Sequence, residues 1–459
     1  MNERQPSVPV ATGLGIGVIG LASMLILLAV KSSDYNTWGA LLLAPILIVA
    51  SLPILSRQAK REGDRRLFWL LIAALVLKLA GALVRDFVAF DVYEGQSDAA
   101  VYHSEGTRIS EQFRDGVFDT GLYGLTGTNF IRFTTGLLYT VTGPTRLGGF
   151  VFYSWLGFWG LFLFYRAFTV AVPQGRSRTY AHLVFFLPSM LFWPSSIGKE
   201  AWMMFTLGIA AYGAARLLSG VTVRGVAYVG LGVWLAAMVR PHIAGLVALS
   251  LIAGILLRRP RATDLRFGLL GKLALLAIVV VASVFLLDRA TEFLESSGFE
   301  TGGGVTGVLQ QTAERTGSSG ESSFEPSILE SPARAPIAIV TVLFRPFLFE
   351  ASSGASAAAA LEATFLLGLT VVRFPWFLSA LRSVRQQPYV GLSLVYTGLI
   401  VLAFSSIANF GLLARERVQL LPFYLVLFCI PPRKGAHAPK DGQSERKMDL
   451  AVPGRFSLG

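Results

Sequence analysis

Long apolar runs alternate with short polar turns along almost the whole chain. A helix needs about 20 consecutive apolar residues to cross a bilayer. The pattern therefore predicts an all-α fold, a polytopic transmembrane bundle of about 12 spans over residues 1–431. The predicted spans are 10–30, 38–55, 67–85, 147–170, 180–195, 200–218, 223–239, 243–258, 267–287, 355–373, 389–407 and 417–431.

Two further apolar stretches are shorter. Residues 129–142 contain Arg132, and residues 336–349 contain Arg345. An arginine within so short a run favours a helix at the membrane surface or a re-entrant helix. Either stretch could instead be a complete membrane span, which would change the number of predicted spans.

Basic residues lie in particular turns and predict the orientation. Cytoplasmic turns carry an excess of Lys and Arg, and the predicted spans place five basic clusters on one side. Both termini are then cytoplasmic, residues 432–459 form a disordered basic tail, and the plasma membrane of a bacterium is the predicted location. The clusters are Arg57, Lys60, Arg61, Arg65 and Arg66; Arg176 and Arg178; Arg258, Arg259, Arg261 and Arg266; Arg373, Arg382 and Arg385; and Arg433, Lys434, Lys440, Arg446 and Lys447.

Two large loops then lie outside the cytoplasm. The first, residues 86–146, carries many charges and amphipathic stretches that predict surface helices. The second covers residues 288–336. Its centre, residues 301–323, is rich in Gly, Ser, Thr and Glu, which predicts a flexible linker or lid.

Composition supports a membrane protein and narrows the chemistry. Charged residues make up 15% of the chain, against about 25% in soluble domains. The net charge of +12 is explained by the basic turns, so we expect no nucleic-acid partner. The single cysteine, Cys429, allows no internal disulfide, and the four histidines are too dispersed to predict a metal site.

Charges at the outer ends of spans are not explained by orientation. In the first outer loop, Asp98 and Tyr102 are four residues apart and share a helix face, with His103 beside them. A carboxylate there can accept a proton from a hydroxyl group or help to hold a metal ion. The alternative is an ordinary solvated acid.

The second candidate is the turn that contains Pro194, Ser195, Lys199 and Glu200. Ser195 is a plausible N-cap for the helix that follows. Exposed N–H groups at a helix start, beside a lysine, favour phosphate binding. The alternative is an ion pair of Lys199 with Glu200 at the membrane surface.

Three more outer segments carry arginines, which bind phosphate through a planar fork. Each arginine taken singly is also explained by snorkelling to the membrane surface. Together they predict binding of a phosphate or a sugar. The candidate residues are Arg240 and His242, Arg345 and Glu350, and Arg415 and Arg417.

This layout resembles the GT-C class of membrane glycosyltransferases and, more loosely, bacterial exopolysaccharide polymerases. The likeness rests on Asp98 in the first outer loop, the turn from Pro194 to Glu200, and the segment from Arg415 to Arg417. It implies that Asp98 is the catalytic base and that the donor is a polyprenyl-phosphate sugar. No second acid adjoins Asp98, so no metal is assigned, and a divalent cation stays open.

Three functions follow from these observations. The first is transfer of a sugar from a lipid-linked donor to a glycan or lipid acceptor at the outer surface, for cell-envelope or exopolysaccharide synthesis. The second is polymerisation or ligation of glycan repeats carried on a lipid diphosphate, and the third is their transport. Transport needs polar groups near the bilayer midplane. Lys78 and Lys272 are interpreted as snorkelling from span ends, which favours an enzyme over a transporter.

Overall fold

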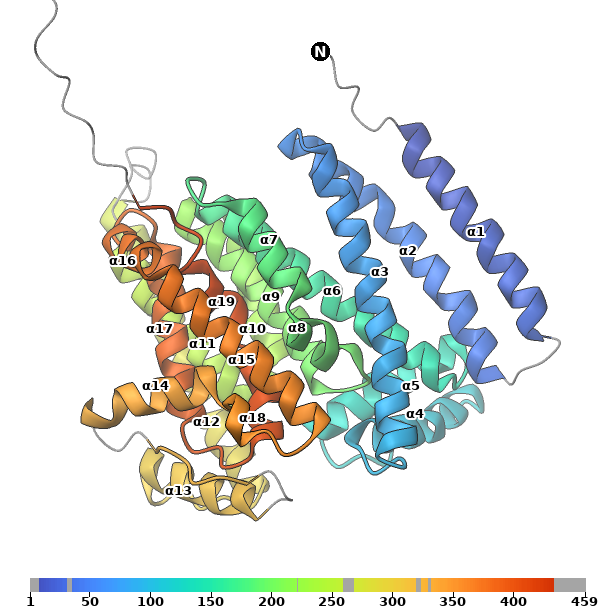
Figure 1. Cartoon of the computed structure of the whole chain (residues 1–459). Coiled ribbons are helices and arrows are strands. Elements are labelled where there is room, and N and C mark those ends of the chain that lie inside the picture. Colours follow the sequence, from blue (N-terminus) through green and yellow to red (C-terminus); the bar gives the residue numbers. More distant parts are fainter. Residues whose placement is uncertain are drawn as a thin grey trace, which may run out of the picture.

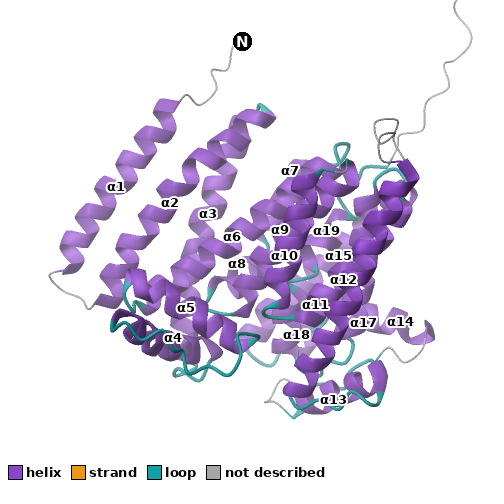
Figure 2. Cartoon of the chain, turned by 180° about the vertical axis from the view of Figure 1, so that it is seen from behind, coloured by secondary structure: helices purple, strands orange, loops and turns teal. Residues whose placement is uncertain are grey.

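The structure is a computed structural model that describes residues 8–30, 35–220, 222–258, 268–318, 323–328 and 332–432. These residues form helices and loops (Figure 2), with one isolated β-bridge between Ser323 and Asn409. The prediction of an all-α fold is therefore confirmed. The predicted tail beyond Pro432 lies outside the described residues, as do three arginines of the third basic cluster.

Long helices stand side by side, and short helices lie across one end of the bundle (Figure 1). The first half of the chain contains α1 (Val8–Val30), α2 (Tyr35–Glu62), α3 (Arg65–Phe87), the π-helical turn η1 (Val88–Val92), α4 (Asp98–Arg114), α5 (Thr128–Thr142), α6 (Arg146–Ala171), α7 (Ser177–Phe186), α8 (Pro188–Phe192), η2 (Trp193–Ser195) and α9 (Lys199–Ser219). The second half contains α10 (Val223–Ala237), α11 (Pro241–Leu257), α12 (Gly268–Ser296), α13 (Gly304–Gly317), η4 (Pro332–Arg334), α14 (Ala335–Phe344), η5 (Leu348–Glu350), α15 (Gly354–Val372), α16 (Phe374–Ser383), α17 (Pro388–Phe404), α18 (Phe410–Arg417) and α19 (Leu421–Val426).

Several of these helices have the length and composition of membrane spans. Among the described residues, five helices qualify: α2, α3 with η1, α6, α9 and α15. The pair α16 and α17, bent by 118° at a short break, gives a sixth if it counts as one span. The protein is therefore a helical membrane protein, but the predicted count of about 12 spans is not confirmed. Helices α10, α11 and α14 are apolar but shorter.

The predicted span at residues 180–195 does not form as one helix. Helix α7 ends before Pro188, and Pro194 interrupts the chain again with non-helical dihedral angles (φ −84°, ψ 39°). A proline removes a backbone donor and crowds the preceding turn, so two prolines six residues apart account for both breaks. The predicted span at residues 417–431 is also discontinuous, because α19 covers only residues 421–426.

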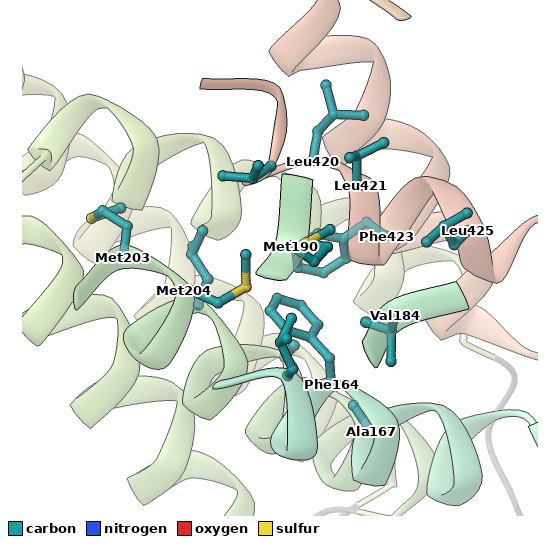
Figure 3. Close-up of a cluster of buried hydrophobic side chains, with 14 of the residues drawn as sticks. Phe164, Ala167, Val184, Met190, Met203, Met204, Leu420, Leu421, Phe423 and Leu425 are labelled. Atoms are coloured by element: carbon teal, nitrogen blue, oxygen red, sulfur yellow. The ribbon is translucent and has the colours of Figure 1, made fainter. Parts of the chain in front are cut away.

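These broken segments pack into the centre of the bundle. Figure 3 shows Met190 of α8 close to Phe164 of α6 and Phe423 of α19, and all three are at most 1% exposed. Helices α6 and α9 approach closely at two glycines, since a Cβ on Gly208 would lie 2.4 Å from the carbonyl oxygen of Gly160. Small residues permit such close helix packing in membranes.

Lys78 contradicts the snorkelling interpretation. Its side chain is 0% exposed, and its Nζ donates to the carbonyl oxygen of Met190 at 2.5 Å. The break around α8 frees this carbonyl from helical hydrogen bonding, which explains how the amine is satisfied in the interior. The side chain of Lys272, the other lysine of that interpretation, lies outside the described residues.

The described basic clusters gather at one end of the bundle, opposite α4, α5 and α13 (Figure 1). Arg178 pairs with Asp64 at 2.7 Å, and the guanidinium groups of Arg176 and Arg373 both contact the ring of Trp376. We call this the basic end and the opposite one the site end. The grouping matches the shared side that the sequence predicts, while the cytoplasmic orientation of that side stays a prediction.

The second predicted outer loop is helical in part, where the sequence predicts a flexible linker or lid. Residues 304–317 form helix α13, which buries Leu309. It is tied to the bundle, because Thr316 Oγ1 accepts a hydrogen bond from the backbone N–H of Ala408 at 2.9 Å. The polar composition of this segment gave no sign of the buried Leu309 or of the hydrogen bond to Ala408.

Candidate functional site

A cavity of about 230 Å³ lies where α3, α4, α9 and α18 meet. Its polar and aromatic walls come from parts of the chain that are far apart in sequence. Drug-sized ligands occupy pockets of roughly 300–1,000 Å³, so this cavity suits a small polar group. The lining residues are Arg85, Ala89, Tyr93, Gln96, Ser97, Asp98, Ala99, Trp193, Ser196, Ile197, Gly198, Glu200 and Arg415.

Arg415 connects two carboxylates in this cavity. Its Nη2 donates to Asp98 Oδ2 at 2.8 Å, and its Nε donates to Glu200 Oε1 at 2.7 Å. These contacts join α18 to the first residue of α4 and to the first turn of α9. The Glu200 carboxylate, helped by weaker contributions from Glu416 and Asp98, raises the pKa of Arg415 above its ordinary value.

The network continues behind the cavity through Arg240. Its Nη2 contacts Glu200 Oε1 at 3.2 Å and donates to Glu416 Oε1 at 2.7 Å. Gln419 Nε2 donates to Glu416 Oε2 at 2.5 Å. Two arginines and three carboxylates, counting Asp98, thus alternate in one chain of charges, which we call the site network.

Exposure changes steeply along the site network. The side chains of Glu200, Arg240 and Glu416 are 4%, 11% and 11% exposed, whereas Asp98 is 58% exposed. Buried charges of this kind need partners. Glu200, Arg240 and Glu416 therefore stabilise the site network from inside the protein. Asp98 is the carboxylate of the network that a ligand can reach.

Local structure explains where the carboxylates stand. Asp98 follows Ser97, which has extended dihedral angles, and Glu200 is the second residue after Gly198. Each acid falls in the first turn of its helix. The positive end of the helix dipole favours a carboxylate at that position. Gly198, not the predicted Ser195, is the N-cap of α9, because Ser195 Oγ donates instead to the carbonyl of Leu191.

Four other predicted residues do not line the cavity. Lys199 is half-buried next to Glu200. Tyr102 is 2% exposed, and this burial raises its pKa above the ordinary value. His103 Nδ1 lies 2.9 Å from the Tyr139 hydroxyl, and the ring of His242 faces the ring of Phe293 at 6.0 Å.

The predicted binding roles of Arg345, Glu350 and Arg417 meet a physical obstacle. Arg345 and Glu350 bind each other, with Nε to Oε1 at 3.0 Å. Burial alone would raise the pKa of Glu350, but hydrogen bonds from Arg345 and from the Phe347 N–H hold it below its ordinary value. Arg417 is 1% exposed and donates to the carbonyls of Leu343 and Arg345. None of the three lines the cavity, and their binding roles stay predictions.

The sequence argument missed one cation, Arg85, at the end of α3. Its guanidinium lies 4.6 Å from the ring centre of Phe192 and 5.1 Å from that of Trp193. Arg85 stands at the outer end of a predicted span, so the test applied to the other arginines would have found it. Tyr93, Gln96 and Ser97 had no comparable signature.

The divalent cation that stayed open at Asp98 finds few ligands. Within the described parts of the chain, no three His, Cys, Asp or Glu side chains converge as metal ligands. The nearest acid in the network, Glu200, is already bound by Arg240 and Arg415.

Comparison with known proteins supplies no relative. No family model, no curated protein and no solved structure matches this chain. The function must therefore be argued from the site itself.

Protonation of His103 gives a first prediction for the helices beside the cavity. Burial, and to a lesser degree the charge of Arg146, lowers its pKa below the ordinary 6.5. The unfolded chain then binds this proton at a higher pH than the folded chain, so stability falls as the pH drops below about 6.5. We expect the thermal unfolding midpoint to decrease in acid, and His103→Gln to remove part of that slope. An identical slope in the variant would contradict the assignment.

Proposed function

We propose that the protein is a membrane glycosyltransferase that uses a polyprenyl-phosphate-linked sugar at the surface formed by its site end. The observation that supports this most is the position of Asp98. It is an accessible carboxylate at the rim of a small cavity whose other walls carry Arg85, Arg415 and the aromatic side chains of Tyr93 and Trp193. A lipid-linked donor can approach such a site laterally from the bilayer.

The proposed reaction uses the carboxylate as a general base. Asp98 accepts the proton of an acceptor hydroxyl group, and the hydroxyl oxygen attacks the anomeric carbon of the donor sugar. The bond from that carbon to the phosphate oxygen breaks, and its electron pair leaves with the phosphate. Cations at the cavity stabilise the negative charge that develops on the leaving group.

The inner residues supply rigidity in this proposal. Glu200 and Arg240 fix Arg415, and Arg415 fixes Asp98. A base held by a chain of buried ion pairs keeps its position relative to the bound donor. The acceptor is a glycan or lipid, and the product belongs to the cell envelope or an exopolysaccharide.

Polymerisation or ligation of glycan repeats on a lipid diphosphate is less well supported. That function relied on Arg240, His242, Arg345 and the pair Arg415 and Arg417 as free groups around a diphosphate. Arg240 is bound by two carboxylates, Arg345 is bound by Glu350, and Arg417 is buried against carbonyls. Few of these cations remain available for a second phosphate.

Transport of a lipid-linked glycan is a second candidate, and one observation favours it. Lys78 is fully buried beside the broken segment of α7, α8 and η2. Broken helices and buried charges are features of transporter binding sites. The sequence argument disfavoured transport because it interpreted Lys78 as snorkelling to the membrane surface. The burial of Lys78 removes that argument.

One experiment separates the candidates. The purified protein is reconstituted in vesicles with a mixture of acceptor glycans and a radiolabelled donor, which is a polyprenyl-phosphate sugar in one reaction and a lipid-diphosphate-linked glycan repeat in another. A transferase produces labelled acceptor and free polyprenyl phosphate, while a transporter moves the labelled lipid between leaflets without breaking it. A polymerase acts only on donors that carry a diphosphate-linked repeat. Movement of intact lipid without transfer from any donor would overturn the proposed function.

A further inference from the structure

We infer that Arg85 is the residue that binds the anionic phosphate group of the ligand in the cavity. This inference rests on the proposed function for the identity of the lipid, but the anion site is argued from the charges alone. Arg85 differs from the other cations near the cavity in what it contacts.

The charges of the site network leave little room for an anion elsewhere. Asp98, Glu200 and Glu416 contribute three negative charges, and Arg240 and Arg415 contribute two positive ones. The ammonium group of neighbouring Lys199 brings these groups to neutrality. Arg85 lines the cavity outside these pairs and adds one positive charge there, and the phosphodiester of the proposed donor carries one negative charge.

The Nε donor of Arg85 is unsatisfied by the described residues of the protein. Within the described part of the chain, its Nε is buried without a hydrogen-bond partner, and no carboxylate forms an ion pair with its guanidinium. Leaving such a donor unsatisfied costs about 1–3 kcal/mol. The rings of Phe192 and Trp193 hold the guanidinium through cation–π contacts, and an arginine placed in this way can bind a phosphate through its planar fork.

A second unsatisfied donor lies in the same cavity. Ser97 Oγ is buried and has no hydrogen-bond partner among the described residues, and it lines the cavity with Arg85. The N-terminus of α9, at Gly198, also lines it and presents backbone N–H groups. An arginine edge, a hydroxyl group and a helix start are together the donors that a phosphate oxygen requires.

The geometry assigns different tasks to the two arginines that line the cavity. Arg415 is occupied by Asp98 and Glu200 and positions the base. Arg85 holds the phosphate. The anomeric carbon of a bound donor would then lie between Arg85 and Asp98, with Tyr93 and Trp193 available to pack on the sugar.

The test measures binding without catalysis. The full chain is purified in nanodiscs of phosphatidylcholine, and its affinity is measured for polyprenyl phosphate and, separately, for inorganic phosphate. We expect Arg85→Gln to weaken binding of polyprenyl phosphate about 10- to 100-fold, as the loss of a charged hydrogen bond implies. Arg289→Gln is the matched control, because Arg289 is exposed near the same end of the bundle and pairs only with Glu292 among the described residues.

The two probes identify the source of the anion. Binding of both probes, weakened in Arg85→Gln, supports a site for any phosphate group, and binding of the lipid alone supports a headgroup site. The inference is wrong if neither probe binds the unmodified protein. It is also wrong if Arg85→Gln binds the probes with the same affinity as the unmodified protein. Arg85→Lys is the second variant, for use if Arg85→Gln does not fold. It keeps the positive charge but loses the planar fork of the guanidinium, so it should bind polyprenyl phosphate several-fold more weakly than the unmodified protein does. Unchanged affinity in this variant would also overturn the inference. The binding measurement involves no sugar transfer, so its result can be interpreted even if the proposed reaction does not occur.

Discussion

Glu200→Ala is expected to lower the free energy of unfolding by about 3–5 kcal/mol, the cost of removing one partner from a buried ion pair. The side chain of Glu200 is 4% exposed and binds both Arg415 and Arg240. Without it, two guanidinium groups remain close together at the start of α9 with less negative charge to balance them. The change is measured by denaturant or thermal unfolding of the purified protein in one detergent.

The matched control is Glu292→Ala. Glu292 also pairs with an arginine, Arg289, but the two side chains are 67% and 58% exposed. Exposed pairs of this kind contribute about 0–1 kcal/mol, so the control should unfold almost as the unmodified protein does. If both alanine variants lose the same stability, the site network does not stabilise the fold as a buried charge cluster.

The broad fold could be predicted because hydropathy is a local property. Runs of apolar residues predicted the helices, and the placement of basic residues predicted that turns as distant as residues 57–66 and 373–385 share one end. Continuity of the spans was harder to predict. Residues 180–195 are apolar enough to cross a membrane, but Pro188 and Pro194 break the helix, and the freed carbonyl of Met190 receives Lys78.

The site was only partly predictable for a related reason. The sequence marked Asp98 and Arg415 as charges that orientation does not explain, but their contact joins residues 317 positions apart and depends on how α4 packs near α18. The sequence argument also assigned phosphate or sugar binding to both Arg415 and Arg417. Residues two positions apart point to different sides of a helix, and in α18 one faces the cavity while the other binds the carbonyls of Leu343 and Arg345.

Asp98→Asn is expected to reduce sugar transfer about 10²- to 10⁴-fold, the usual contribution of a general base. The amide retains the shape of the side chain and can still accept a hydrogen bond from Arg415, but it cannot take the proton of the acceptor hydroxyl. Because Asp98 is 58% exposed, the loss of its ion pair should change the unfolding free energy by less than about 1 kcal/mol.

The division between kcat and KM tests the role of Asp98 as a base rather than as an anchor. A base acts in the transition state, so Asp98→Asn should lower kcat and leave the KM for the lipid donor nearly unchanged. Asp115→Asn is the control, since Asp115 is an exposed acid at the other end of α4. A loss that appears mainly in KM would make Asp98 a binding residue. Activity at the level of the unmodified protein would remove it from the mechanism, and the reaction would then need another base at the cavity.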